Sequence, residues 1–202
     1  MIKVKICGLC TVEDAGKVNR CLPDYVGFVF AEGSKRRITC SQAREMKKML
    51  AAGIRAVGVF VNQEIPMIAG LVREGIIDVV QLHGDESIRD ILELRRHVSC
   101  PVIKAVPVGN TFPARLPAGA DYLLFDTATR ERGGSGKRFD WALVASVNVP
   151  FFLAGGLNEE NVSEALQMIS PYCVDVSSGV ETDGVKDEEK MRRFIRLIRE
   201  GK

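Results

Sequence analysis

The order of apolar segments along the chain predicts an α/β protein, a single closed (β/α)8 barrel of the TIM-barrel type. Eight short apolar runs recur in 202 residues, and charged stretches with helical spacing lie between them. Strands that alternate with helices form a parallel sheet that is buried on both faces. Eight repeats of roughly 25 residues each favour a closed barrel near the lower end of its size range. An open doubly wound sheet is the structural alternative.

Each apolar run is interpreted as one strand of the barrel. The expected strands, in chain order, are residues 2–7, 25–30, 55–61, 77–82, 101–106, 121–126, 150–154 and 173–178. Ser41 opens the helical segment 41–53 and Asn158 opens the helical segment 158–169, and both residue types are typical N-caps. The last segment, 186–200, carries an apolar stripe that suits a helix packed on a sheet. Its members are Met191, Phe194, Ile195 and Ile198.

Composition and charge exclude several classes of protein. Hydrophobic residues make up 46% and charged residues 27%, which is typical of a folded globular chain. The net charge of +2 does not favour nucleic acid or an anionic membrane as a partner, and no apolar run approaches the roughly 18 residues of a membrane span. MIKVKICG reads as a strand rather than a signal peptide, so free thiols in a reducing cytoplasm are expected. No linker divides the chain, which predicts one domain over residues 1–202.

Polar residues at the C-terminal ends of the strands are the candidates for chemistry, because barrels carry their active sites there. Cys7 ends the first strand, and the alternation of a strand points Lys5 and Cys7 into the barrel. A nearby ammonium group lowers the pKa of a thiol and populates the thiolate. The alternative is a structural role, since free cysteine is also a common small core residue.

Three further strand-end residues are candidates. Asp126 ends the sixth strand, where a carboxyl group serves as a general acid, a metal ligand or a helix cap. His83 follows the fourth strand, either as a substrate contact or as a structural histidine. Arg36 is a candidate fork for a substrate carboxylate. Lys35 and Arg37 flank it, and spacing alone does not decide which of the three faces the site.

A phosphate site is predicted in the loops after the seventh and eighth strands. Gly155 and Gly156 are expected to lead straight into a helix, while Ser178 and Gly179 follow the last strand. Backbone N–H groups that glycine leaves accessible bind anions, above all beside helix N-termini. Two tight turns with capping glycines are the alternative.

Two other motifs are weak. GGSGK (133–137) fails the P-loop pattern, because Glu131 and Arg138 stand where that pattern needs Gly and Ser or Thr. Its glycines favour a loop that moves over the site. CGLC (7–10) matches a C-x-x-C redox pattern, but nothing else supports a thioredoxin-like fold. The remaining cysteines and the two histidines show no paired spacing for zinc, so no metal and no cofactor are expected.

Motifs from the first strand to the last resemble those of the phosphoribosylanthranilate isomerase family of tryptophan biosynthesis. Each motif alone is weak, but KICG, GGSGK-FDW and DVSSGVE in this order are specific. The matching segments are KICG (5–8), GFVF (27–30), SKR (34–36), VQLHG (80–84), LFDT (124–127), GGSGKRFDW (133–141), LAGGL (153–157) and VDVSSGVE (174–181).

The resemblance implies a cofactor-free Amadori rearrangement of N-(5-phosphoribosyl)anthranilate to 1-(2-carboxyphenylamino)-1-deoxyribulose 5-phosphate. It implies Cys7 as general base, Asp126 as general acid and Arg36 as the residue that holds the anthranilate carboxylate. His83 is expected to contact the substrate, and the glycine loops are expected to hold its phosphate. The expected partner is therefore a small phosphorylated molecule, bound by a cytoplasmic monomer or homodimer.

Two segments depart from the family pattern, and three other functions stay open. Cys10 stands where the family usually has Thr, and AEG (31–33) replaces an aromatic–Pro stretch. Neither departure touches a proposed catalytic group, and any effect is expected on substrate positioning. Another phosphosugar enzyme is one alternative, either an indole-glycerol-phosphate synthase or a sugar-phosphate isomerase. The synthase should need a catalytic lysine and further acids on other strands. A non-catalytic regulator that binds a phosphometabolite would need the glycine loops without Cys7 and Asp126. A thiol oxidoreductase would need Cys10 as much as Cys7.

Overall fold

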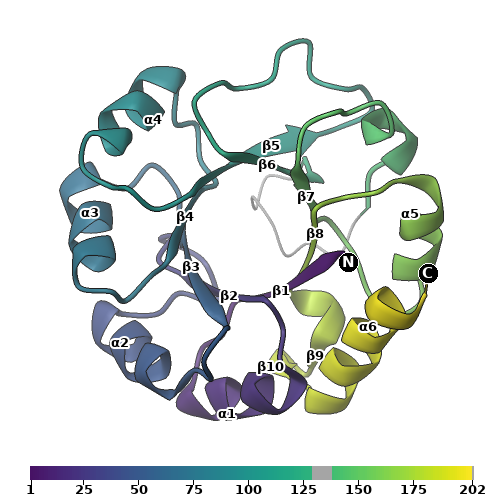
Figure 1. The fold of residues 1–202 in the computed structure, drawn as a ribbon, viewed down its shortest axis with the longest axis horizontal. Coiled ribbons are helices and arrows are strands. Elements are labelled where there is room, and N and C mark those ends of the chain that lie inside the picture. The colour runs from purple at the N-terminus through teal and green to yellow at the C-terminus, as the bar shows by residue number, and fades with distance from the viewer. Residues whose placement is uncertain (129–137, 202) are drawn as a thin grey trace.

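The protein forms a closed parallel barrel, as a computed structural model describes it for residues 1–128 and 138–201. Its eight strands pair in chain order, and β8 pairs with β1, which rules out an open sheet (Figure 1). A short antiparallel hairpin of β9 (Glu181–Thr182) and β10 (Val185–Lys186) follows the barrel. The barrel strands are β1 (Lys3–Cys7), β2 (Tyr25–Val29), β3 (Arg55–Phe60), β4 (Val79–Leu82), β5 (Val102–Val108), β6 (Tyr122–Thr127), β7 (Phe151–Leu153) and β8 (Cys173–Val176).

Helices form an outer ring around the barrel (Figure 1). They are α1 (Val12–Cys21), α2 (Cys40–Met49), α3 (Ile65–Arg73), α4 (Ile88–Arg95), α5 (Val162–Met168) and α6 (Glu188–Glu200), with 3-10 turns η1 (Trp141–Val144) and η2 (Ser178–Val180). The connection between β5 and β6 departs from the expected repeat, because residues 109–121 contain no helix. Pro113 and Pro117 interrupt this segment, and proline inside a helix removes a hydrogen bond and clashes with the preceding turn.

The predicted helix starts were wrong by a few residues at two places. Helix α2 is capped by Thr39 in a capping box. The Thr39 side chain accepts a hydrogen bond from Gln42 N, and the Gln42 side chain accepts one from Thr39 N. Ser41 is therefore inside the helix. Helix α5 is capped at Asn161 rather than Asn158. The Asn158 side chain instead accepts hydrogen bonds from two backbone N–H groups in the turn before the helix, an alternative that asparagine commonly takes.

Apolar side chains form two layers, one on the outward face of the strands and one inside the barrel. The larger one joins the outward face of the barrel to the helices, and the predicted stripe of α6 belongs to it, with Met191 and Phe194 fully buried. A second cluster fills the barrel and includes Val57, Ile103 and Phe152. No helix in residues 1–128 or 138–201 is long and apolar enough to cross a bilayer.

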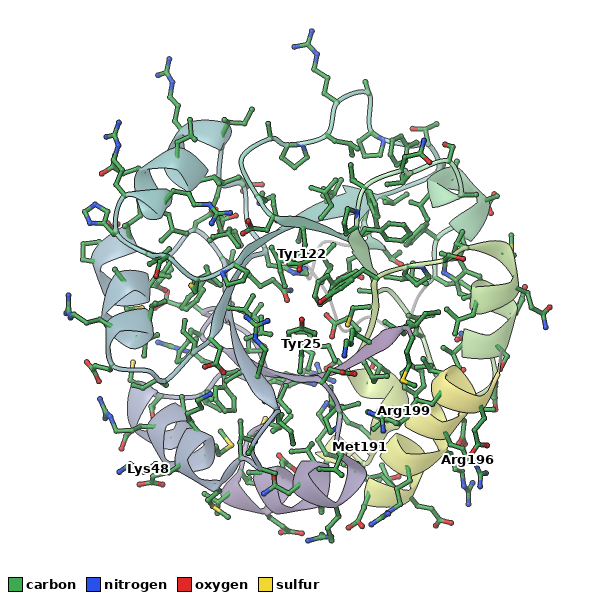
Figure 2. All side chains as sticks on the ribbon, in the orientation of Figure 1. Tyr25, Lys48, Tyr122, Met191, Arg196 and Arg199 are labelled. Carbon is green, nitrogen blue, oxygen red and sulfur yellow. The ribbon has the colours of Figure 1, made fainter. Side chains whose placement is uncertain are left out.

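Aromatic rings fill the N-terminal end of the barrel interior. Tyr25 and Tyr122 stand at the starts of β2 and β6, and both lie near the centre of the ring of strands (Figure 2). The Tyr122 ring stacks on Tyr172 at 4.8 Å between centroids, and the Tyr25 and Tyr172 hydroxyls lie 2.9 Å apart. These large side chains fill the N-terminal end of the interior, which is called the lower end below. The charged residues of the interior therefore lie nearer the C-terminal end.

Candidate active site

The C-terminal ends of the strands bring the predicted acid, base and glycine loops to one end of the barrel. Asp126 on β6 lies 3.4 Å from His83 after β4, measured from Oδ2 to Nε2. A Cβ atom built on Gly155 would be 3.1 Å from Asp126 Oδ1, so the loop after β7 adjoins the acid. The Ser177 hydroxyl after β8 donates to the Cys7 carbonyl at 3.0 Å. The loop after β8 therefore adjoins the thiol-bearing strand.

Cys7 occupies a space that its neighbouring strand leaves open. It pairs with Gly27 in the β1–β2 register. A Cβ atom on Gly27 would lie only 2.6 Å from Cys7 Sγ, so no larger residue fits opposite the thiol. Val29 and Val59 form a small apolar cluster against which Cys7 packs. The Cys7 side chain is therefore packed on one side by apolar residues, and the residue as a whole is partly buried.

The charges below Cys7 belong to a buried ion pair. Lys5 is fully buried and donates to Asp175 Oδ2 at 2.8 Å across the β1–β8 pair. Burial raises the pKa of the Cys7 thiol, while the Lys5 ammonium lowers it and the Asp175 carboxylate raises it. The net direction is upward. Lys5 therefore lowers the thiol pKa as a nearby ammonium should, but desolvation and Asp175 together outweigh its effect.

Asp126 and His83 form a second polar pair across the mouth of the barrel. One Asp126 oxygen accepts from Thr127 N at 2.7 Å, and the other faces His83. The opposite ring nitrogen of His83, Nδ1, lies 2.9 Å from Gln81 Nε2, which can donate to it. This bond leaves Nε2 as the ring atom that carries a proton toward Asp126. His83 is therefore placed to orient the carboxyl group of Asp126.

Arg36 is the basic residue of its segment that turns inward. Lys35 and Arg37 are exposed, whereas Arg36 is half-buried. Its Nε and Nη2 atoms donate to the two oxygens of Glu181 at 2.7 and 2.6 Å. A Cβ atom on Gly8 would overlap Arg36 Cδ, so the glycine after Cys7 lets the arginine side chain pass over it. This packing holds the guanidinium beside the end of β1.

The two glycine loops pack against each other. Gly155 and Gly156 adopt φ values of 90° and 65°, a region that favours glycine. A Cβ atom on Gly179 would overlap the Leu157 carbonyl oxygen, so this glycine allows the close approach of the two loops. The expectation that Gly156 leads straight into a helix was wrong, because α5 begins only at Val162. The 3-10 turn η2 begins at Ser178.

The sequence analysis did not single out four polar residues that the structure buries, namely Gln81, Lys104, Asp175 and Lys186. Alternation along β4 and β8 places Gln81 with His83, and Asp175 with Ser177, so that pattern contained a usable signal. Lys104 lies on the outward face of β5. Its ammonium group donates to Gly84 O at 2.6 Å and to Glu86 Oε2 at 2.7 Å. Lys186, beyond the barrel, offered no comparable pattern.

The redox and metal readings gain no support. Cys7 and Cys10 are both free thiols. Burial raises the pKa of Cys10 too, and its thiol donates to Gly8 O at 3.6 Å. In the described ranges 1–128 and 138–201, no cluster of three or more His, Cys, Asp or Glu residues could hold a metal ion. The predicted mobile loop GGSGK (133–137) lies outside the described residues.

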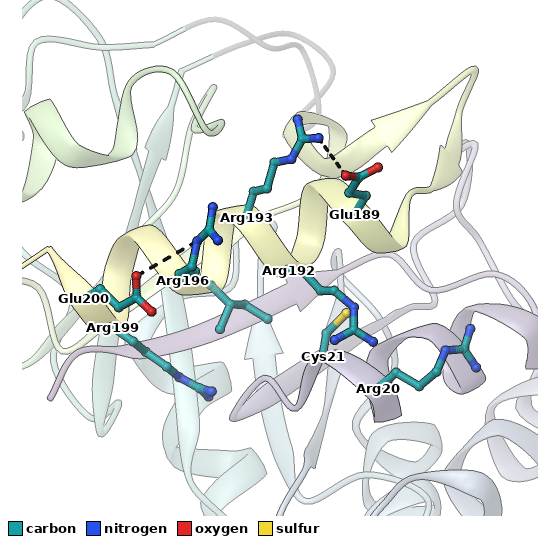
Figure 3. Close-up of a pocket in the computed structure, with 9 residues that line it drawn as sticks. Arg20, Cys21, Glu189, Arg192, Arg193, Arg196, Arg199 and Glu200 are labelled. Atoms are coloured by element: carbon teal, nitrogen blue, oxygen red, sulfur yellow. Dashed lines mark hydrogen bonds and ion pairs between the residues drawn. The ribbon is translucent and has the colours of Figure 1, made fainter.

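A groove of about 560 Å³ lies on the outside of the barrel, between α1 and α6 (Figure 3). Five arginines line it together with Cys21 and two glutamates. The arginines are largely engaged, since Arg20 and Arg192 donate to Glu188, and Arg193 donates to Glu189. None of the residues that line this groove belongs to the C-terminal strand ends or the loops that follow them, so it is not a part of the candidate active site.

Comparisons with known proteins agree with the geometry. The family model described as N-(5'-phosphoribosyl)anthranilate (PRA) isomerase matches residues 4–197. The N-(5'-phosphoribosyl)anthranilate isomerase of Endomicrobium trichonymphae is 48% identical over 200 residues, which cover 98% of this chain and 99% of that protein.

Solved structures show the same relationship. The crystal structure of phosphoribosyl anthranilate isomerase from Thermus thermophilus superposes with a TM-score of 0.87 at 35% identity and covers all of both chains. A structure of phosphoribosyl anthranilate isomerase in complex with reduced 1-(o-carboxyphenylamino)-1-deoxyribulose 5-phosphate gives a TM-score of 0.81 at 34% identity, covering 99% of this chain and 100% of that one. The chain belongs to the N-(5'-phosphoribosyl)anthranilate isomerase family.

Proposed function

We propose that this protein converts N-(5'-phosphoribosyl)anthranilate to 1-(2-carboxyphenylamino)-1-deoxyribulose 5-phosphate, a step of tryptophan biosynthesis, by general acid and base catalysis. One observation carries the proposal: Cys7 and Asp126 stand at the same end of one barrel, on β1 and β6, with both glycine loops beside them. Three strand steps separate β6 from β1 through β7 and β8. That separation suits an acid and a base that flank a single sugar.

Asp126 acts first in this mechanism. Its carboxyl group donates a proton to the furanose ring oxygen as the bond from that oxygen to C1 breaks. The nitrogen lone pair forms the C1=N iminium, so the charge on the substrate is balanced by the new Asp126 carboxylate. The Nε2 proton of His83, on the other side of a 3.4 Å contact, stabilises that carboxylate.

Cys7 then acts as the base. Its thiolate takes the proton from C2, whose acidity the iminium has raised, and the C2–H electron pair forms the enolamine. Transfer of the enol proton to C1 gives the ketone. A raised thiol pKa makes the thiolate a stronger base but a scarcer species at neutral pH, and the buried Lys5 ammonium limits this cost.

The remaining groups hold the ends of the substrate. Arg36 faces the anthranilate carboxylate, a partner that suits a planar guanidinium fork. Backbone N–H groups around Gly155, Gly156, Ser178 and Gly179 bind the phosphate. Binding both ends fixes C1 and C2 between acid and base, which is the positional part of catalysis. We further propose that residues 1–202 act as one cytoplasmic catalytic domain without a cofactor, as a monomer or homodimer.

An assay of purified protein on phosphoribosylanthranilate tests the proposal, together with rescue of a tryptophan auxotroph that lacks this step. Cys7→Ala and Asp126→Asn should each lower kcat by at least about 100-fold while product-analogue affinity stays within about tenfold. Cys10→Ser should be nearly silent. Normal turnover by either catalytic variant would remove that residue from its role. Ligand binding without turnover in the unmodified protein would favour a regulator instead.

A further inference from the structure

Glu181 occupies only one edge of the Arg36 guanidinium. The carboxylate takes Nε and Nη2, at 2.7 and 2.6 Å. Arginine presents five N–H groups in a fixed plane, so the edge made by Nη1 and the second Nη2 proton is still available for another carboxylate. Within residues 1–128 and 138–201, no protein group is hydrogen-bonded to Nη1 of Arg36.

Lys186 offsets the charge of that carboxylate. Its Nζ donates to Glu181 Oε1 at 2.5 Å and to the Ser177 carbonyl at 3.1 Å. The Lys186 side chain is 1% exposed and that of Glu181 is 7% exposed, so both charges lie away from solvent. Arg36, Glu181 and Lys186 together carry a net charge of +1. The arginine therefore keeps its attraction for an anion although it is already paired.

The same three residues connect separate parts of the site. Glu181 follows directly on η2, which belongs to the phosphate loop after β8. Lys186 bonds to Ser177, whose hydroxyl donates to the Cys7 carbonyl at 3.0 Å. Arg36 in turn passes over Gly8, the residue after Cys7. Because both Glu181 oxygens are bonded to Arg36 and the Glu181 side chain is buried, a displacement of Glu181 also moves the Arg36 guanidinium.

We propose that Glu181 and Lys186 are positioning residues that fix Arg36 with one guanidinium edge toward the substrate carboxylate, and so set the preference for a carboxyl-bearing aryl amine. This inference rests on the proposed function. Glu181 supplies the orientation, because a two-point contact defines the plane of the guanidinium. Lys186 supplies the charge balance, because without it the Glu181 carboxylate would neutralise Arg36. Burial favours the neutral acid, but hydrogen bonding by Arg36 and the charge of Lys186 hold the pKa of Glu181 below its usual value.

A charge-matched double variant tests the orientation. Glu181→Leu with Lys186→Met keeps the net charge at +1 and replaces a buried pair by apolar side chains of similar size, a change that proteins often tolerate. Two ligands are compared by calorimetry: reduced 1-(o-carboxyphenylamino)-1-deoxyribulose 5-phosphate and the same molecule without its carboxyl group. The double variant should bind the first about tenfold more weakly, roughly 1.4 kcal/mol, and the second within about twofold.

The single variant Lys186→Met tests the charge balance. It leaves Glu181 to neutralise Arg36, so the carboxyl-bearing ligand should bind at least about tenfold more weakly while the other ligand is little affected. Glu188→Gln is the matched control, because Glu188 pairs with Nε and Nη2 of Arg20 on the outside of the barrel. That variant should bind both ligands like the unmodified protein.

Four results would overturn the inference. Equal weakening of both ligands in the double variant would assign the pair a structural role. Unchanged or tighter binding of the carboxyl-bearing ligand would show that Glu181 competes for Arg36. Unchanged binding by Lys186→Met, or a loss in Glu188→Gln, would remove the charge argument. Arg36→Ala separates the two proposals, because unchanged carboxyl-dependent binding there would refute the proposed role of Arg36 itself.

Discussion

Gly155 offers a direct test of how closely the loop after β7, our proposed phosphate loop, packs against Asp126, the proposed acid. Its φ is 90°, and a Cβ atom there would lie 2.8 Å from Thr127 N and 3.1 Å from Asp126 Oδ1. Ordinary contacts of a Cβ atom begin near 3.4 Å. Gly155→Ala must therefore separate the loop from the β6 backbone by 3.4 − 2.8 = 0.6 Å, and the displacement falls on Asp126, on the phosphate loop or on both.

The expected effect on catalysis follows from that displacement. A misplacement of about 1 Å in an active site costs on the order of 100-fold in rate, so 0.6 Å should lower kcat/KM by roughly 10-fold or more. The left-handed backbone adds about 1 to 2 kcal/mol of strain for alanine. In a protein of this size each kcal/mol lowers Tm by about 2 to 4 °C.

Gly184 provides the control for backbone strain. Its φ is 80°, close to that of Gly155, but no atom lies within 4 Å of the position of a Cβ. Gly184→Ala should therefore lower Tm by a similar amount and leave kcat/KM within about twofold. Steady-state kinetics and thermal unfolding of the two variants, measured side by side, decide the matter. Equal kcat/KM in Gly155→Ala and Gly184→Ala would refute the argument from close packing.

Two further predictions concern the thiol and the loop after β4. The rate of Cys7 alkylation by iodoacetamide is measured against pH by mass spectrometry, with Cys7→Ala as the reference. Because burial raises the thiol pKa, this rate should reach its midpoint above the usual thiol value of about 8.5. A midpoint below pH 8 would contradict this prediction. Lys104→Met leaves the buried Glu86 carboxylate without its cation, so it should cost about 3 to 5 kcal/mol in the free energy of unfolding. Adding Glu86→Gln to Lys104→Met should recover part of that loss. If the free-energy changes of the two single variants, measured by denaturant unfolding, simply add up in the double variant, the two residues do not interact as an ion pair.

The barrel was predictable because its signal is repeated. Each strand is a run of apolar residues, and eight such runs leave few topologies open. The segment 109–121 shows the limit of that logic, since the repeat predicted a helix where two prolines prevent one. The helix starts were misplaced for a similar reason. Thr39, Ser41, Asn158 and Asn161 are all acceptable caps by residue type, and only the geometry of the preceding loop selects among them.

The candidate site was predictable where it follows strand periodicity. Cys7, His83 and Asp126 end strands, so a parallel barrel places them together whatever the details of packing. The net pKa direction of Cys7 was not predictable, because it depends on how far Asp175 offsets Lys5 and how fully the thiol is desolvated. Glu181 was equally inaccessible to sequence reasoning, since its partner Arg36 lies 145 residues earlier in the chain.

The barrel interior contains a buried ion pair whose presence is not explained by its contribution to stability alone. Tyr25, Tyr122 and Phe152 fill the lower end with aromatic surface, which contributes to folding. Above them, Lys5 and Asp175 are buried as ions, and one oxygen of Asp175 has no hydrogen-bond partner in the described residues. Such a pair seldom stabilises a fold more than apolar residues of the same size would. The Lys5 ammonium and the Asp175 carboxylate both act on the Cys7 thiol, and the neighbouring Asp126 carboxyl group raises the pKa of Asp175. The buried pair therefore lies electrostatically between Cys7 and Asp126, the two residues to which we assign the roles of base and acid.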